Sequence, residues 1–222
     1  GLYRCNERVV NLGTGAPVGD PTTQRVLFEE KFPEVRGKHC LLFLGRVHVK
    51  KGNDLLFHAL ADVLKSGASS ELASWHLVIA GPHEHAYGHE MKALAEKLGV
   101  ANRVTWTGML TGDLKWGAFH RAEAFVLPSH QENFGIAVAE ALACGVPVLI
   151  SNKVNIWREI EEDRAGLVEN DDVNGTKKLL QRWLALSSSE RELMRGRASA
   201  CFAERFHVDQ SAKALIGVLS GK

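Results

Sequence analysis

Short apolar runs alternate with amphipathic stretches along this sequence, and no other feature constrains the fold as strongly. The apolar runs have the length of strands, and several contain few polar residues, as expected for strands that are covered on both faces. The stretches between them carry apolar residues at helical spacing, as Leu56, Leu60 and Val63 do. This alternation predicts an α/β domain built from βαβ units around a parallel sheet.

The same pattern places the individual elements. It predicts strands at residues 39–47, 75–81, 103–108, 124–128, 146–151 and 166–168. It predicts helices at residues 53–66, 88–98, 113–121, 135–143, 156–162, 173–186, 189–204 and 209–219. Ser189 and Glu192 form a candidate capping box, and residues 11–21 are rich in turn formers and predict a loop. We therefore divide the chain into a connector at 1–38, a main domain at 39–206 and a C-terminal helix at 207–222.

Composition and charge exclude several classes of protein. The 222 residues include 27 Lys and Arg and 26 Asp and Glu, which argues against binding nucleic acid mainly through its phosphates. No apolar run approaches the roughly 20 residues that span a bilayer, and residues 1–5 lack the apolar part of a signal peptide. The four cysteines are scattered, which predicts buried free thiols in a reducing compartment.

The loop after the first predicted strand carries a candidate anion site. Ligands of an open parallel sheet bind at the carboxyl ends of its strands, and here Gly45, Arg46 and Lys51 follow such an end. A guanidinium can bond two phosphate oxygens, and an ammonium can add a point charge. Neither a Walker A loop nor a G-x-G-x-x-G motif follows this strand. The alternative that Arg46 and Lys51 are solvated surface charges stays open at this point.

The stretch after the fourth predicted strand combines carboxylates with the start of a helix. Glu132 lies in the loop, Gly135 begins the predicted helix, and Glu140 lies about 8 Å further along its axis. Amides at a helix N-terminus bind anions, and carboxylates accept hydrogen bonds from vicinal hydroxyls. The neighbours of Glu140 are apolar on all sides, which predicts a buried helix and a glutamate with a functional partner. A ligand carrying a diphosphate and sugar hydroxyls would fit along this helix start.

Four segments occur here in one order and together resemble a known family. They are the Gly-Arg…Lys-Gly element at 45–52, the segments at 77–82 and 104–108, and the Glu-x7-Glu stretch within 132–148. The combination resembles the C-terminal, donor-binding domain of retaining family 4 glycosyltransferases, the glycosyl transferases group 1 of GT-B architecture. The resemblance covers about residues 39–206 and implies a Rossmann-like parallel sheet with helices on both faces.

The resemblance implies that these residues bind a nucleoside-diphosphate sugar. Arg46 and Lys51 would stabilise the leaving diphosphate, Glu132 would bind hydroxyls of the transferred sugar, and Glu140 would bind the ribose. Further donor contacts are implied for Gly45, Gly81 and Asn133, for the amides of Phe134, Gly135 and Ile136, and near the base for Leu110 and Lys115. The resemblance implies no metal or other cofactor, because cations and a helix start can neutralise the leaving group.

Enzymes of this family react in a cleft between two Rossmann-like domains, and this chain is long enough for one. The resemblance therefore implies an absent N-terminal domain that binds a glycan or lipid-linked acceptor, in polysaccharide or glycolipid assembly. It implies a cytoplasmic protein whose isolated domain binds donor and transfers little, and it leaves peripheral attachment at the inner membrane face open. Residues 153–159 replace the Gly-Gly turn that the family often has, so the contact of this loop with the donor stays open.

Two other functions stay open. Paired carboxylates also serve glycoside hydrolases, although Glu132 and Glu140 suit a ligand that runs along the helix better. A nucleotide-sugar sensor would keep the pocket without the chemistry. We expect His83 and the neighbouring acids to be solvated rather than to bind a metal, and Arg191 and Arg195 to be surface charges. We expect the five tryptophans to pack in the core.

Overall fold

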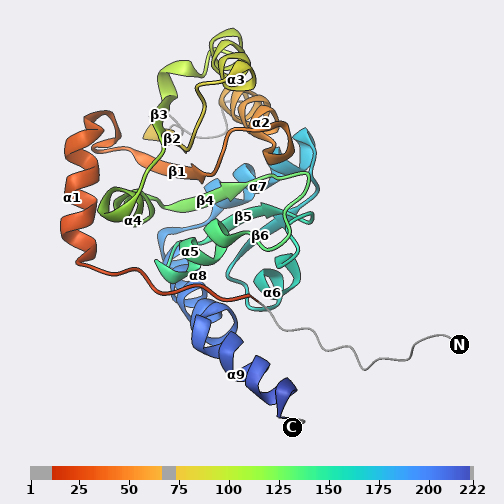
Figure 1. The fold of residues 1–222 in the computed structure, drawn as a ribbon. Coiled ribbons are helices and arrows are strands. Elements are labelled where there is room, and N and C mark those ends of the chain that lie inside the picture. Colours follow the sequence, from red (N-terminus) through yellow and green to blue (C-terminus); the bar gives the residue numbers. More distant parts are fainter. Residues whose placement is uncertain (1–11, 67–73, 221–222) are drawn as a thin grey trace, which may run out of the picture.

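The computed structural model describes residues 12–66 and 74–220, and one six-stranded sheet lies at its centre (Figure 1). The strands are β1 His39–Leu44, β2 Trp75–Ala80, β3 Val104–Gly108, β4 Ala124–Leu127, β5 Val148–Ser151 and β6 Gly166–Glu169. All neighbouring strands are parallel, in the order β3-β2-β1-β4-β5-β6. This is the strand order of the Rossmann fold, so the predicted fold class and all six predicted strands are confirmed.

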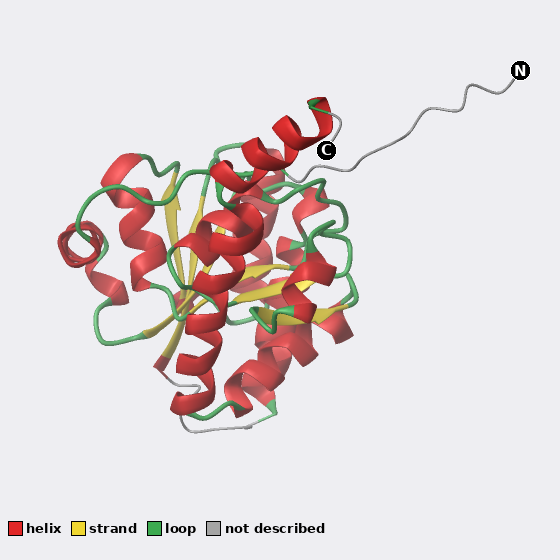
Figure 2. Ribbon diagram, turned by 90° about the horizontal axis from the view of Figure 1, so that it is seen from below, coloured by secondary structure: helices red, strands yellow, loops and turns green. Residues whose placement is uncertain are grey.

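Helices cover both faces of this sheet (Figure 2). They are α1 Pro21–Lys31, α2 Asn53–Lys65, α3 Ala86–Lys97, α4 Gly112–Arg121, α5 Ile136–Ala143, α6 Trp157–Glu162, α7 Val173–Ala185, α8 Ser188–Cys201 and α9 Val208–Leu219. All eight predicted helices are present. The helix predicted over 189–204 differs in its last part, because a π-helical segment, Phe202–Phe206, follows α8.

Helix α1 lies within residues 1–38, which the sequence pattern assigns to a connector. The Asp20 side chain accepts a hydrogen bond at 2.8 Å from an amide of the first turn, and Pro21 takes the first helical position, where an amide donor is dispensable. The helix packs against α4. It escaped prediction because only Gln24 and Phe28 among its residues are buried, which is too little for an apolar stripe.

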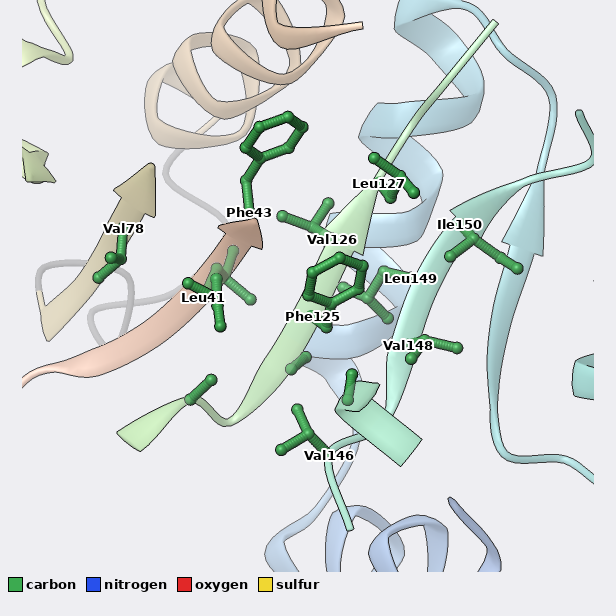
Figure 3. Close-up of a cluster of buried hydrophobic side chains, with 14 of the residues drawn as sticks. Leu41, Phe43, Val78, Phe125, Val126, Leu127, Val146, Val148, Leu149 and Ile150 are labelled. Carbon is green, nitrogen blue, oxygen red and sulfur yellow. The ribbon is translucent and has the colours of Figure 1, made fainter. Parts of the chain in front are cut away.

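The middle strands of the sheet carry the core (Figure 3). Phe125 and Val126 of β4 and Leu149 of β5 are fully buried, and β4 pairs with β1 on one side and with β5 on the other. Full burial of one such side chain stabilises the fold by about 1.5–3 kcal/mol. The apolar runs that predict the strands therefore also hold the carboxyl ends of β1 and β4 beside each other.

The capping box of α8 lies two residues earlier than predicted. Ser187, rather than Ser189, accepts a hydrogen bond from the Glu190 amide at 3.3 Å, and the Glu190 carboxylate accepts one from the Ser187 amide at 2.8 Å. Three consecutive serines permit more than one register in the sequence. In the structure α7 ends at Ala185 and α8 begins at Ser188, so Ser187 takes the N-cap position.

The expected surroundings of the thiols and indoles are largely confirmed. Cys40 and Cys201 are buried free thiols, Cys144 is half-buried, and Cys5 lies outside the described residues. The tryptophans lie in the core or pack against it. Over the described ranges, none of the helices has both the length and the apolar character that crossing a bilayer requires.

Candidate functional site

A cavity of about 550 Å³ opens at the carboxyl ends of β1 and β4. These strands are neighbours in the sheet, and the strand order reverses between them, so their ends form the switch point at which ligands of such sheets bind. The cavity is lined by residues from both strand ends and from the start of α5. They are Leu12, Leu44, Gly45, Arg46, Lys51, Leu127, Glu132, Asn133, Phe134, Gly135, Ile136, Ala137 and Glu140.

The loop after β1 brings two cations to this cavity. Arg46 is exposed at its edge, and Lys51 ends a short 3-10 turn, Val49–Lys51. Gly52 follows with a φ of +68°, and a side chain there would collide with the Pro128 carbonyl oxygen at the end of β4. This close approach carries Lys51 across to the residues that follow β4.

Lys51 forms an ion pair with Glu132, and the two side chains are 26% and 19% exposed. The backbone of Glu132 is fixed from the other side by the loop after β5. Its amide donates to the Lys153 carbonyl oxygen at 3.0 Å, and its carbonyl oxygen accepts from the Asn155 amide at 3.0 Å. The loop at 153–155, which departs from the pattern of the resembled family, therefore contacts the site through the backbone of Glu132.

The start of α5 supplies backbone donors. Gly135 takes the N-cap position with a φ of +81°, so the first amides of the helix lie at the cavity wall. The Phe134 ring packs edge-on against Phe206, with ring centroids 5.8 Å apart. This contact fixes the turn that precedes the helix. The amides, the positive end of the helix dipole and the two cations can together neutralise a doubly charged anion.

Glu140 lies one turn further along α5, and its side chain is 12% exposed. Its Oε1 atom accepts a hydrogen bond at 2.9 Å from the Nζ atom of Lys115, which α4 supplies. The sequence predicts that this glutamate needs a partner. It does not predict this lysine, which lies 25 positions away and on another helix.

Three residues that the sequence placed in the donor site do not line the cavity. Gly81 follows β2, and a side chain there would collide with the carbonyl oxygen of Gly45. A glycine at this position therefore lets the ends of β1 and β2 approach closely. Leu110 is 9% exposed and belongs to the core. Lys115 reaches the site only through Glu140.

The sequence analysis does not predict four of the residues that line the cavity. Leu44 and Leu127 are the last residues of β1 and β4, and Ala137 lies in the first turn of α5, so their positions alone could have indicated them. Leu12 comes from the segment assigned to the connector, where no pattern in the sequence marked it.

A second cavity, of about 470 Å³, lies near the amino ends of β1 and β4. Arg191, which is 9% exposed, approaches the Glu123 carboxylate at 3.7 Å. Arg195 donates to the carbonyl oxygen of Ala122 at 3.1 Å. The expectation that both arginines are surface charges is therefore wrong, because their guanidiniums hold α8 against the residues that precede β4.

His83 also differs from expectation. It is 5% exposed, its Nδ1 atom lies 3.1 Å from the Gly81 carbonyl oxygen, and its ring centroid lies 5.2 Å from that of Trp106. It is thus packed rather than solvated. Throughout the part of the chain that the structure describes, no three His, Cys, Asp or Glu side chains are grouped so that they could hold a metal ion.

Comparisons with known proteins identify relatives of this chain. Residues 25–199 match the family model described as glycosyl transferases group 1. Over 182 residues the chain is 30% identical to D-inositol 3-phosphate glycosyltransferase of Acidothermus cellulolyticus, covering 80% of this chain and 40% of that protein. The protein of the same name from Corynebacterium jeikeium is 30% identical over 219 residues, covering 95% of this chain and 51% of that protein.

A solved structure shows the same fold. The Anabaena protein Alr3699/HepE, crystallised in complex with UDP and glucose, superposes with a TM-score of 0.80 at 18% identity. The match covers 97% of this chain and 57% of the Anabaena protein. Across these three proteins, the chain spans between 40% and 57% of their length.

Proposed function

This chain belongs to the glycosyl transferases group 1 family, and we propose that it forms the donor-binding half of a retaining glycosyltransferase. The whole enzyme would transfer a sugar from a nucleoside-diphosphate sugar to an acceptor and keep the configuration at the anomeric carbon. One observation carries this proposal. A single cavity at the switch point of the sheet joins Arg46, Lys51 and the start of α5 with two carboxylates, Glu132 and Glu140.

The positive groups of the cavity suit the diphosphate. Arg46 and Lys51 approach from the β1 side and the α5 amides from the β4 side, so the anion would lie between them. Negative charge grows on the leaving nucleoside diphosphate as the glycosidic bond breaks. Cations and helix amides that are already in place stabilise this charge without reorganisation.

The carboxylates suit the two hydroxyl-bearing ends of the donor. Glu132, in the loop, would accept hydrogen bonds from the transferred sugar, and Glu140, along α5, would accept them from the ribose. Each carboxylate already bonds a lysine in this structure, Lys51 and Lys115 respectively. A hydrolase would need one of them as a proton donor. Because each carboxylate faces an ammonium, both carboxylates are better suited to accept hydrogen bonds from a ligand than to donate a proton to it.

The acceptor, in this proposal, binds to a part of the enzyme that this chain does not contain. The partial coverage of the relatives supports this location of the acceptor site. The chain spans 40% of the Acidothermus protein and 51% of the Corynebacterium protein, so about half of each relative has no counterpart in it. We propose a glycan or lipid-linked acceptor, and a cytoplasmic enzyme. Buried free thiols at Cys40 and Cys201 fit a reducing compartment.

Calorimetry on this chain tests donor binding. UDP, GDP, ADP and UDP-glucose are titrated into the wild type and into Arg46→Ala and Glu140→Gln variants, since UDP occupies the Anabaena neighbour. We expect one nucleoside diphosphate to bind, and both substitutions to weaken it about tenfold or more. As a control, Arg182→Ala removes an arginine that pairs with Glu169, 2.7 Å away and outside the cavity. If the wild type, Arg46→Ala and Glu140→Gln bind the nucleoside diphosphate with equal affinity, the proposed site is refuted.

Catalysis requires a second experiment. The full-length protein that contains this sequence is incubated with the donor that binds and with candidate acceptors, and the anomeric configuration of the product is read by NMR. Transfer with retained configuration supports the proposal. Donor binding without transfer would favour a sensor, and cleavage of oligosaccharides by this chain alone would favour a hydrolase.

A further inference from the structure

Lys115 and Glu140 form an ion pair across two helices at the edge of the cavity. The Lys115 Nζ atom lies 2.9 Å from Glu140 Oε1, and the two side chains are 22% and 12% exposed. Glu140 lines the cavity and Lys115 does not. The ammonium therefore reaches the site through the carboxylate, from the side of α4.

A second contact fixes the ammonium in place. The Nζ atom of Lys115 lies 4.0 Å from the centroid of the Trp116 ring, and Trp116 packs against the core. A lysine held by an indole and a carboxylate has lost most of its side-chain freedom before any ligand arrives. It can thus set the orientation of Glu140 rather than follow it.

The surroundings of Glu140 make this partner necessary. Its neighbours Ala139 and Ala141 are fully buried, and the half-buried Cys144 lies one turn further along the helix. Burial and, to a smaller extent, the negative charge of Glu140 together raise the pKa of the Cys144 thiol to about 12, and the Lys115 ammonium opposes this rise. A carboxylate in such surroundings loses stability when its ammonium is removed.

The pair leaves enough acceptor capacity for a ligand. A carboxylate offers about four lone-pair positions, and Lys115 occupies one of them, on Oε1. Two hydroxyls of a vicinal diol need two more. The bond from Lys115 is therefore compatible with a ribose held by Glu140 at the same time.

We infer that Lys115 is a positioning residue that orients Glu140 for the ribose diol, and that it does not read the base. This inference rests on the proposed function, because it takes the ribose as the group that Glu140 binds. It makes Lys115 part of the discrimination between a ribonucleotide and its deoxy analogue.

Binding measurements with matched ligands test the inference. UDP and 2′,3′-dideoxy-UDP, or the corresponding pair for whichever of UDP, GDP and ADP binds, are titrated into the wild type and into Lys115→Met. We expect the substitution to weaken the ribonucleotide about tenfold, the cost of losing one charge-assisted contact. The dideoxy analogue should bind both forms within about twofold of each other. Lys115→Arg should restore most of the lost affinity.

Two further variants separate this role from a structural one. In an E140Q background, Lys115→Met should cost little more, because its effect passes through the charge of Glu140. Lys92→Met is the matched control, since Lys92 also lies over a tryptophan, with Nζ 5.6 Å from the Trp106 centroid, but outside the cavity. Melting temperatures show that each variant is folded.

The outcomes distinguish this inference from the proposed function. If no nucleoside diphosphate binds the wild type, the proposed function fails, and the inference fails with it. If the ribonucleotide binds and Lys115→Met leaves its affinity unchanged, only the inference fails. An equal loss for the ribonucleotide and its dideoxy analogue would overturn it too, and would place Lys115 at the base or the phosphates.

Discussion

Replacing Glu132 by glutamine is predicted to strengthen binding of a bare nucleoside diphosphate. The Glu132 carboxylate pairs with the Lys51 ammonium, and a diphosphate must compete with that carboxylate for the cation. The side chains are 26% and 19% exposed, so the pair belongs at the upper end of the range for solvent-accessible ion pairs, about 1 kcal/mol. Since 1.4 kcal/mol is a factor of ten, the variant should bind the diphosphate roughly fivefold more tightly.

The same substitution is predicted to weaken the preference for the sugar-bearing donor. Glutamine accepts hydrogen bonds from the sugar hydroxyls without a charge, and charged acceptors are worth about 1.5–3 kcal/mol against about 1 kcal/mol for neutral ones. The ratio of the affinities for the nucleotide sugar and for the nucleoside diphosphate should therefore fall about tenfold. Calorimetry with both ligands on the wild type and on Glu132→Gln measures this ratio.

Two controls make the measurement decisive. Glu169→Gln removes a carboxylate of similar exposure, 21%, that pairs with Arg182 outside the cavity, and it should change neither affinity. Raising the salt concentration should reduce the gain for the bare diphosphate, since the competition is electrostatic. A loss of affinity for the bare diphosphate in Glu132→Gln would refute the reasoning. It would show that Glu132 positions Lys51 for the diphosphate rather than competing with the diphosphate for it.

Three further tests, two of them with a control substitution, address the fold and its pH dependence. Phe125→Ala, in the middle of the sheet, should lower the free energy of unfolding by about 3–5 kcal/mol in urea titrations, whereas Leu193→Ala, 56% exposed, should change it by about 0.5 kcal/mol or less. Gly52→Ala should destabilise the protein by at least about 1 kcal/mol and weaken diphosphate binding, because φ is +68° and the Pro128 carbonyl blocks a side chain. Gly196→Ala, in an open position of α8, should instead stabilise it by about 0.5–1 kcal/mol, and a cost there would contradict the argument. Burial raises the pKa of the Cys144 thiol to about 12, against about 8.5 in an unfolded chain, so its contribution to stability is complete below pH 8.5 and is lost as the pH rises toward 12. Urea unfolding from pH 8 to 10.5 should therefore show a shallower decline in a Cys144→Ala variant, and parallel curves would count against this assignment.

Much of the fold follows from the local pattern. Each strand is an apolar run whose two covered faces leave no place for polar side chains, as in β4, where all four residues are buried. Helix α5 is apolar around most of its circumference, which explains why the sequence predicts a buried helix and a glutamate that needs a partner. Helix α1 shows the limit of this reasoning, since it buries only Gln24 and Phe28 and depends on docking to α4.

The candidate site is likewise predictable from the sequence only in part. The order of residues along the chain is enough to place Arg46 and Lys51 after one strand and Glu132 after another, and the rule that ligands bind at strand ends brings both loops into view. Which atoms then meet was not predictable. Lys51 and Glu132 are 81 positions apart, and Lys115 and Glu140 are 25 apart, so neither pairing lies within the reach of a helical or strand period.

The sequence by itself thus determined the alternating elements, the parallel sheet and the set of charged and amide groups that gather at one edge. Only the tertiary structure decided which lysine neutralises which carboxylate, and which of the implied donor residues lie outside the cavity. The physical reason is one of range. Periodicity and turn chemistry act over a few residues, whereas the pairing of partly buried charges depends on how strands and helices distant in the chain are packed beside one another.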